Sequence, residues 1–205
     1  MKILILDIET TGLIPDQHAI VEVGMVLIDT DTREKEIVYD KIVRDPVFDP
    51  ETTKDAWVFE NTSLTHEEVV NGVPLEECRE EIQALFNQYP VTAYNKKFDL
   101  GFFGHRGYTF TERDCLMEKC TKYSDNYDKN GRQRWPKAEA IYNKFFPESN
   151  YVEAHRGADD AWHEADIAFK LIDIHLEERN EIKLRNYCYI NGLTYVEKEH
   201  ISSEQ

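Results

Sequence analysis

The chain has 205 residues, a formal net charge of −16 at pH 7 and a hydrophobic content of 41%. At about 150 residues per domain, this length fits one domain with a core of its own. No apolar run approaches the ~20 residues that a membrane span needs, and the apolar start of the chain is shorter than the ~7–15 residues of a secretory signal. The negative charge excludes broad binding of duplex nucleic acid through a basic surface.

The cysteine spacing does not fit a structural zinc site. The four cysteines form no C-x-x-C pair: they are Cys78, Cys115, Cys120 and Cys188. Free thiols in a reducing compartment are the simpler interpretation. The sequence therefore predicts a cytoplasmic protein that does not act at a membrane.

Three β-strands are predicted in the first part of the chain. Residues 2–6 are a short apolar run, and residues 20–28 are rich in β-branched side chains. Residues 36–43 alternate roughly between apolar and polar, and the polar stretch 29–33 before them favours a hairpin turn. We therefore expect the sheet to begin with three antiparallel strands.

Helical signals dominate the rest of the chain. Thr65, with Glu68 three residues later, predicts a capped helix start, and the apolar residues of 74–88 recur about every 3.6 positions. The remaining predicted elements are a short strand at 90–94, helices at 96–105, 138–146 and 158–178, a polar loop at 124–134 and a frayed tail at 197–205. Strands followed by alternating helices and strands predict a mixed α/β sheet with helices on its faces.

Two carboxylates come directly after the first apolar run. Asp7 and Glu9 stand two residues apart, so on a strand their side chains point to the same face. Carboxylates held that close repel each other unless a cation lies between them. Acidic residues are common in this chain, so the pair alone is a weak signal. Its position beside a buried strand, where unpaired charge is costly, makes it a candidate site.

Two further polar sites accompany predicted helices. Asp99 lies near the start of helix 96–105, where an acid also complements the helix dipole. His155 precedes helix 158–178, where a single histidine is most often structural, and Asp160 lies in the first turn of that helix. Asp159 is the alternative to Asp160, from which a helix turns it by ~100°. Each site alone is ambiguous, and the combination of all three is more informative.

The three sites together resemble the motifs of the DEDDh 3′–5′ exonucleases, the DnaQ-like (epsilon) proofreading branch of the ribonuclease H-like superfamily. Residues 7–12 match D-x-E-T-T-G, residues 95–99 match N-x-x-F-D, and His155 with Asp160 match H-x(4)-D. The resemblance implies an exonuclease domain over residues 1–180, with an α/β fold: a ribonuclease H-like mixed five-stranded sheet flanked by helices. Residues 181–205 are then a C-terminal extension of unknown role.

The chain departs from the family pattern at two places. Thr62, Ser63 and Leu64 stand where the family has His, Gly and Ile, and Tyr94 replaces the commoner His before Asn95. The resemblance implies substrate contacts from Thr10, Thr11, Gly12, Leu13, Leu64, Asn95 and Phe98, with core packing as the alternative for Phe98. A local basic rim is expected from Lys96, Lys97, Arg106 and Arg156, with solvated side chains as the alternative.

The residue types of these sites also suggest the chemistry. Oxygen ligands favour Mg²⁺ or Mn²⁺ over zinc, and two such ions can activate a water and stabilise the leaving oxygen of a phosphodiester. The expected cofactors are two Mg²⁺ ions, for which Mn²⁺ substitutes, held by Asp7, Glu9, Asp99 and Asp160, with Asp7 bridging both. His155 would act as general base, which completes the expected catalytic set.

We therefore expect a metal-dependent 3′–5′ exonuclease that releases 5′-mononucleotides from single-stranded or frayed DNA. Two alternatives stay open: an enzyme that trims RNA or small oligonucleotides, and a catalytically silent nucleic-acid-binding adaptor of the same fold. The expected partners are 3′ ends of single-stranded DNA or RNA and, for a separate proofreading subunit, a DNA polymerase. The sequence leaves the oligomeric state open.

Overall fold

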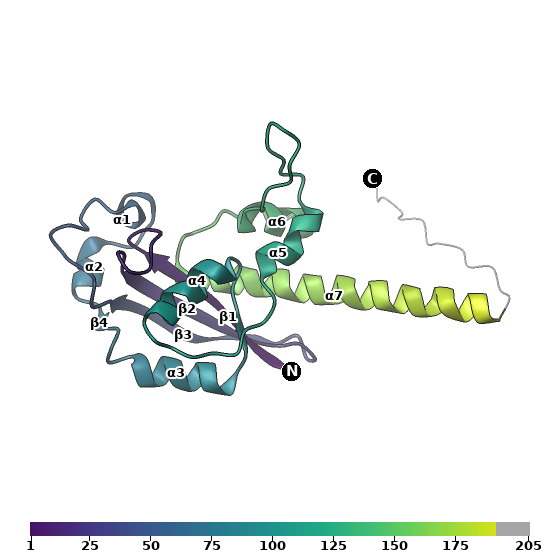
Figure 1. Cartoon of the computed structure of the whole chain (residues 1–205), viewed down its shortest axis with the longest axis horizontal. Helices are drawn as coiled ribbons and strands as arrows, with labels where there is room; N and C mark the ends of the chain where they lie inside the picture. The colour runs from purple at the N-terminus through teal and green to yellow at the C-terminus, as the bar shows by residue number, and fades with distance from the viewer. Residues whose placement is uncertain (192–205) are drawn as a thin grey trace. The chain divides into compact units, whose positions relative to one another are not determined.

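Three N-terminal strands form the antiparallel part of the sheet in the computed structural model, which describes residues 1–191 (Figure 1). The strand β1 (Lys2–Thr10) pairs with β2 (Ile20–Asp29), and β2 pairs with β3 (Lys35–Arg44). The predicted antiparallel start is confirmed. Because the ladder continues through Asp7 and Glu9, β1 extends four residues beyond its apolar run.

Two short parallel strands complete a five-stranded mixed sheet, as expected. β5 (Val91–Thr92) pairs with β1, and β4 (Val73–Pro74) pairs with β3, which gives the order β4-β3-β2-β1-β5. Because β1 and β5 run in the same direction, their carboxyl ends meet at one edge of the sheet. The residues that follow β5 therefore start a helix close to Asp7.

The helices lie mostly where the sequence predicts them. They are α1 (Trp57–Asn61), α2 (His66–Val70), α3 (Arg79–Gln88), α4 (Lys96–His105), α5 (Leu116–Cys120), α6 (Ala138–Phe145) and α7 (Gly157–Ile190), with a 3₁₀ turn η1 (Thr121–Tyr123). The predicted capping box is confirmed: the Thr65 hydroxyl accepts from the Glu68 amide, and the Glu68 carboxylate accepts from the Thr65 amide.

Two predicted helix boundaries are wrong. The helix predicted from residue 74 begins at Arg79, because Pro74 belongs to the parallel strand β4 and a turn follows it. The helix predicted to end at residue 178 continues to Ile190, since no glycine or proline lies between those positions to stop it. The predicted loop 124–134 is confirmed, although Tyr127 and Gln133 form an isolated bridge in it.

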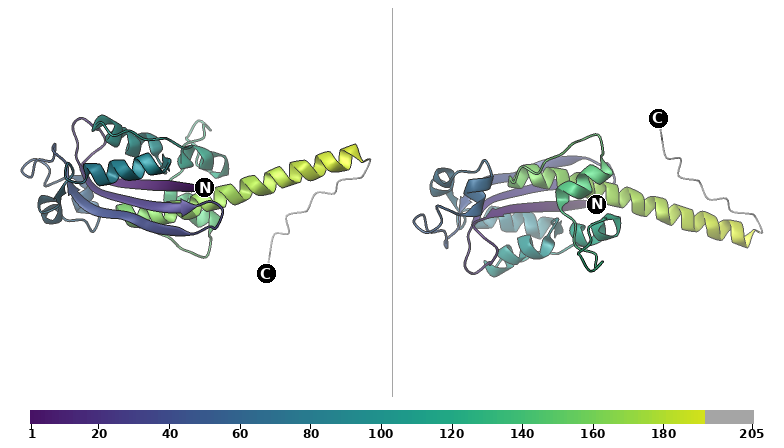
Figure 2. Two further views of the ribbon diagram at one scale, coloured as in Figure 1. Left: turned by 90° about the horizontal axis from the view of Figure 1, so that it is seen from below. Right: turned by 90° about the horizontal axis from the view of Figure 1, so that it is seen from above.

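The main apolar core lies between the sheet and the pair α3 and α4. Phe86, Phe102 and Phe103 are fully buried and belong to one cluster with the β1 residues Leu4 and Leu6. Figure 2 shows α4 and the first turns of α7 on opposite faces of the sheet. Consecutive side chains of β1 point to opposite faces, so Asp7 and Glu9 face away from this core.

Contacts divide the chain into two units, Met1–Lys170 and Leu171–Gln205, and α7 runs through both. The domain limit that the sequence suggests, residue 180, falls within α7. The tail predicted at residues 197–205 lies outside the described residues. None of the helices within residues 1–191 combines the length and apolar character that crossing a bilayer requires.

The start of α7 contacts β2 backbone to backbone. A Cβ atom on Gly24 would lie 2.0 Å from the carbonyl carbon of Gly157, and one on Gly157 would lie 3.2 Å from the Asp7 carbonyl oxygen. Neither position has room for a side chain. Gly24 is the residue that pairs with Asp7 across the sheet, so this contact brings the first turn of α7 next to Asp7.

We expect Gly24→Ala to destabilise the protein by about 1–3 kcal/mol, because the added methyl group meets backbone that cannot move without shifting α7. Urea unfolding measures the change. Gly101→Ala is the matched control: Gly101 lies within α4 and its Cβ would meet nothing within 4 Å, so this variant should be more stable by about 0.5–1 kcal/mol. A Gly24→Ala protein as stable as the wild type would contradict the interpretation.

Candidate active site

Four predicted carboxylates from three elements come together beside the end of β1. Asp7 and Glu9 lie on β1, Asp99 lies in the first turn of α4, and Asp160 lies in the first turn of α7. Asp99 and Asp160 are each only 3% exposed. Burial raises the pKa of Asp7 well above its usual value, and the charges of Glu164, Asp99, Glu9 and Asp160 raise it further. Asp159, the alternative to Asp160, is exposed.

The electrostatics of this group oppose full ionisation. Burial, followed by the charges of Asp160 and Glu22, raises the pKa of Glu9 to about 8. Burial also raises the pKa of Asp99 to about 8, although backbone amides donate hydrogen bonds to its carboxylate. The ionised forms of buried carboxylates that lie close together are stabilised when a cation binds between them. The donor set, hard oxygen atoms with excess negative charge, therefore fits a divalent metal ion.

His155 lies beside two of these carboxylates. One ligand atom each of Glu9, His155 and Asp160 lies within 4.8 Å of the other two, so the imidazole is close enough to share a metal site or to act next to one. The backbone of His155 is in the left-handed region, with φ of 51°. Its ring contacts the ring of Trp57 edge to face, with 5.1 Å between the centroids. Trp57 belongs to α1, and no sequence motif indicated this contact.

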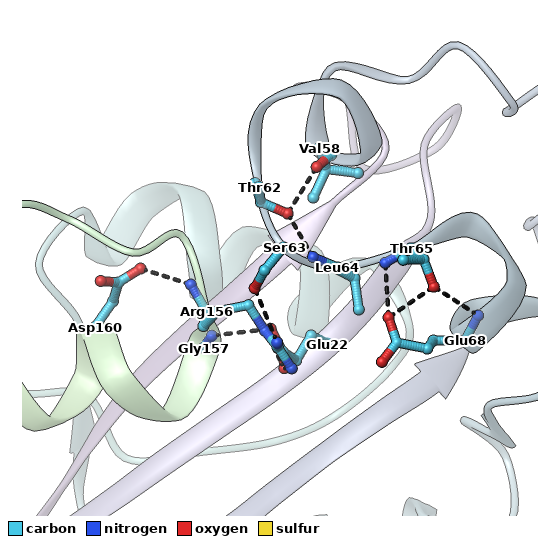
Figure 3. Close-up of polar contacts among 10 residues, drawn as sticks. All are labelled: Glu22, Val58, Thr62, Ser63, Leu64, Thr65, Glu68, Arg156, Gly157 and Asp160. Carbon is cyan, nitrogen blue, oxygen red and sulfur yellow. Dashed lines mark hydrogen bonds and ion pairs between the residues drawn. The ribbon is translucent and has the colours of Figure 1, made fainter.

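An ion pair next to His155 anchors this segment to the sheet (Figure 3). Arg156 Nη2 donates to Glu22 Oε1 at 2.6 Å, and Arg156 Nη1 donates to Ser63 Oγ at 3.2 Å. The amide of Gly157 donates to the second Glu22 oxygen at 3.1 Å. Glu22 is 1% exposed, so both of its oxygens are satisfied within the protein. Ser63, which departs from the family glycine, thus contributes to the anchor.

The expected basic rim is largely neutralised by carboxylates. Arg156 is engaged by Glu22, and Lys96 lies 2.7 Å from Glu112. Arg106 donates to the buried Asp45 at 2.6 Å and to the carbonyl oxygens of His18 and Pro15. These side chains hold loops together, and Arg106 fixes the loop that follows β1. The expected basic rim is therefore corrected at Lys96, Arg106 and Arg156, whose charges are paired with carboxylates, while Lys97 is exposed.

The predicted substrate residues have different environments. Leu13 is 79% exposed, and Asn95 is exposed before the first turn of α4. Thr10 donates to the Gly12 carbonyl, and Thr11 accepts from the Ala19 amide, so both hydroxyls shape the loop after β1. The ring of His18 covers Gly12.

Two predicted substrate residues belong to apolar clusters. Phe98 is half-buried and packs against the main core, with its ring 5.0 Å from that of Phe102. Leu64 has no exposed surface and packs in a second core cluster with Val58 and Val69, so its predicted substrate contact is corrected to core packing.

Sequence reasoning missed a further buried carboxylate. Glu164 is 4% exposed, and its pKa is raised well above the usual value by burial and by the charges of Asp99 and Asp160. It accepts a hydrogen bond from the Tyr94 amide at 3.1 Å, which ties α7 to the junction of β5 and α4. Its position four residues after Asp160 puts both side chains on one helix face, which was the signal available in the sequence.

The sequence matches the model of a protein family described as RNase_T exonuclease over residues 4–168. No curated protein sequence matches it. Its fold is similar to a solved structure described as 3′-end-specific recognition of the histone mRNA stem-loop by a 3′-exonuclease, with 18% identity, a TM-score of 0.63, and 84% of this chain and 81% of that chain covered.

Two other solved structures have a similar fold. One is the nuclease domain of 3′hExo, described as a DEDDh family member bound to rAMP, with 19% identity, a TM-score of 0.62, and 84% and 92% of the two chains covered. The other is E. coli Exonuclease I in complex with a dA16 oligonucleotide, with 17% identity, a TM-score of 0.61, and 91% and 45% covered. The expected ribonuclease H-like fold is confirmed.

The metal-free protein should lose stability as the pH rises from about 5 to 8. The pKa of Glu9 is about 8 in the folded protein and near 4.5 in the unfolded chain, so within this window the folded state holds a proton that the unfolded state has released. Each such proton lowers the free energy of unfolding by about 1.4 kcal/mol per pH unit.

Urea unfolding in EDTA at several pH values measures this slope. Glu9→Gln should flatten it, because glutamine does not titrate, and excess Mg²⁺ should flatten it as well. A stability that is constant or rises across this window in the wild type, or an unchanged slope in Glu9→Gln, would contradict the electrostatic description.

Proposed function

The chain belongs to the RNase_T exonuclease family. We propose that it hydrolyses phosphodiester bonds from the 3′ end of single-stranded or frayed DNA and releases 5′-mononucleotides. The observation that carries the proposal is the convergence of four carboxylates. The charges of Glu9, Asp99 and Asp160 raise the pKa of Asp7. His155 lies beside Glu9 and Asp160. Residues far apart in the sequence supply this set, and every member has an acid, base or metal-binding side chain.

The proposed cofactors are two Mg²⁺ ions, for which Mn²⁺ substitutes. Asp7, Glu9, Asp99 and Asp160 would hold them, because their oxygen atoms are the ligands that these ions prefer. When bound, such ions lower the pKa of water and stabilise negative charge on the phosphate and leaving oxygens. The carboxylates themselves orient the site, since Asp99 and Asp160 are buried and hydrogen-bonded to backbone amides.

His155 is the proposed general base. Its imidazole accepts a proton from the attacking water as the oxygen of that water bonds to the phosphorus of the terminal nucleotide. The bond between this phosphorus and the 3′ oxygen of the penultimate nucleotide breaks, and that oxygen leaves. The contact with Trp57 and the fixed backbone of Arg156 limit where the ring can lie.

The preference for unpaired ends follows from charge. Duplex binding relies on many phosphate contacts from Lys and Arg, and this chain has a net charge of −16 with Arg106 and Arg156 paired to carboxylates. A small acidic site that binds cations instead holds one terminal phosphodiester. Unpairing the terminal nucleotides of a duplex costs a few kcal/mol. A frayed or mismatched end is already unpaired, so its binding does not carry this cost.

The other predictions from the sequence stay predictions. Trimming of RNA or small oligonucleotides is the alternative activity, and a silent adaptor is the alternative without activity. A DNA polymerase partner, a cytoplasmic location and a domain limit at residue 180 rest on the sequence alone.

Purified protein should shorten 5′-labelled single-stranded DNA stepwise from the 3′ end in Mg²⁺ or Mn²⁺, and should not do so in EDTA. Asp7→Asn should abolish cleavage, because it removes the carboxylate that lies among all the others. Gel electrophoresis resolves the products, and chromatography identifies the mononucleotides. Faster cleavage of matched RNA would favour the trimming enzyme, and a lack of cleavage on all substrates would favour the adaptor. Cleavage of circular single-stranded DNA would contradict the proposal that the enzyme starts from a free 3′ end.

His155→Ala should lower turnover by about 10²–10⁴-fold, the usual scale for loss of a general base. His155→Asn controls for the backbone, since asparagine tolerates the left-handed conformation of this residue better than alanine. Both variants should retain their affinity for Mn²⁺, because His155 is the base and not a ligand. A large loss of Mn²⁺ affinity with an unchanged pH profile of turnover would reassign His155 as a metal ligand.

A further inference from the structure

The carboxylate of Asp160 is held by three hydrogen-bond donors. The Tyr151 hydroxyl donates to Oδ1 at 2.7 Å, and the Ala154 amide approaches the same oxygen at 3.3 Å. The Arg156 amide donates to Oδ2 at 2.9 Å. An ionised carboxylate offers about four lone-pair sites, so three are used within the protein and about one is left for a cation.

Tyr151 is the donor among these three that depends on a side chain, and its ring and backbone are both fixed. Its ring stacks on His163, with 4.0 Å between the centroids and 26° between the planes, and lies 4.8 Å from the ring of Tyr142. Asn143 on α6 accepts from the Tyr151 amide at 2.8 Å and donates to its carbonyl at 2.7 Å. The hydroxyl is therefore held at one point relative to α7.

We propose that Tyr151 is a positioning residue that fixes the rotation of the Asp160 carboxylate, so that its remaining lone pair is presented to a divalent cation. The inference rests on the proposed role of Asp160 as a metal ligand. Without the hydroxyl, Oδ1 keeps only the longer contact with the Ala154 amide. The carboxylate then samples orientations in which the free lone pair turns away from the site. Hydrogen bonds of this kind typically change metal affinity by about 10–100-fold.

Tyr151→Phe and Tyr142→Phe form a matched pair. Each replacement removes one hydroxyl and keeps a ring in the same aromatic group. Tyr142 donates to Asp166 at 3.2 Å, and Asp166 pairs with Lys35 and is not a proposed ligand. The Mn²⁺ signal in electron paramagnetic resonance reports free ion, so titration of the metal-free full-length chain gives the dissociation constant without any turnover.

We expect Tyr151→Phe to weaken Mn²⁺ binding by about 10–100-fold and Tyr142→Phe to leave it within about twofold of the wild type. Turnover of Tyr151→Phe on single-stranded DNA should recover as Mn²⁺ is raised. Unchanged Mn²⁺ affinity in Tyr151→Phe overturns the proposal, and so does an equal loss in both variants, which would assign the effect to ring packing. Melting temperatures in EDTA confirm that both variants fold.

Asp160→Asn separates this inference from the proposed function. If Asp160→Asn loses Mn²⁺ affinity and Tyr151→Phe does not, the metal site stands and the positioning role fails. If Asp160→Asn binds Mn²⁺ as the wild type does, the ligand assignment fails, and the positioning role is overturned with it.

Discussion

The docking of the first turn of α7 on β2 is the constraint on which the candidate site depends. Gly24 and Gly157 meet without side chains, and Glu22 accepts from both the Arg156 guanidinium and the Gly157 amide. This contact fixes the direction in which α7 leaves the sheet. Asp160, less than one turn after Gly157, is thereby held beside Asp7. A looser contact would separate the α7 carboxylate from those on β1.

The same region concentrates negative charge that folding alone does not favour. Burying a carboxylate without a partner costs several kcal/mol, and Asp7, Asp99 and Glu164 add to one another's cost. The protein compensates in part with backbone amide donors and with the Arg156–Glu22 pair at the border of the group. The negative charge that stays uncompensated is confined to this region. The large apolar core on the opposite face of the sheet supplies the stability that offsets its cost.

Much of this arrangement was predictable because local patterns carry it. The strand–carboxylate sequence at Asp7, the helix 96–105 and the spacing of His155 from Asp160 are all short-range signals, and the resemblance to the DEDDh exonucleases joined them into one predicted site. The misses at the candidate site are long-range. Leu64 is core because segments distant in sequence pack over it, and Tyr151 reaches Asp160 only through the fold of the loop between α6 and α7. No periodicity or motif encodes such a partner.

The contact between Gly24 and Gly157 also has a consequence for the order of events during synthesis. A ribosome releases the chain from its N-terminus, so the strands that carry Asp7 and Glu9 emerge long before α7. Until Gly157 has left the exit tunnel, no element is present to bring Asp160 to them. A chain that stops short of Gly157 contains Asp7, Glu9 and Asp99 but lacks Asp160 and the helix that positions it. The proposed exonuclease site would thus stay incomplete for most of the translation of this chain.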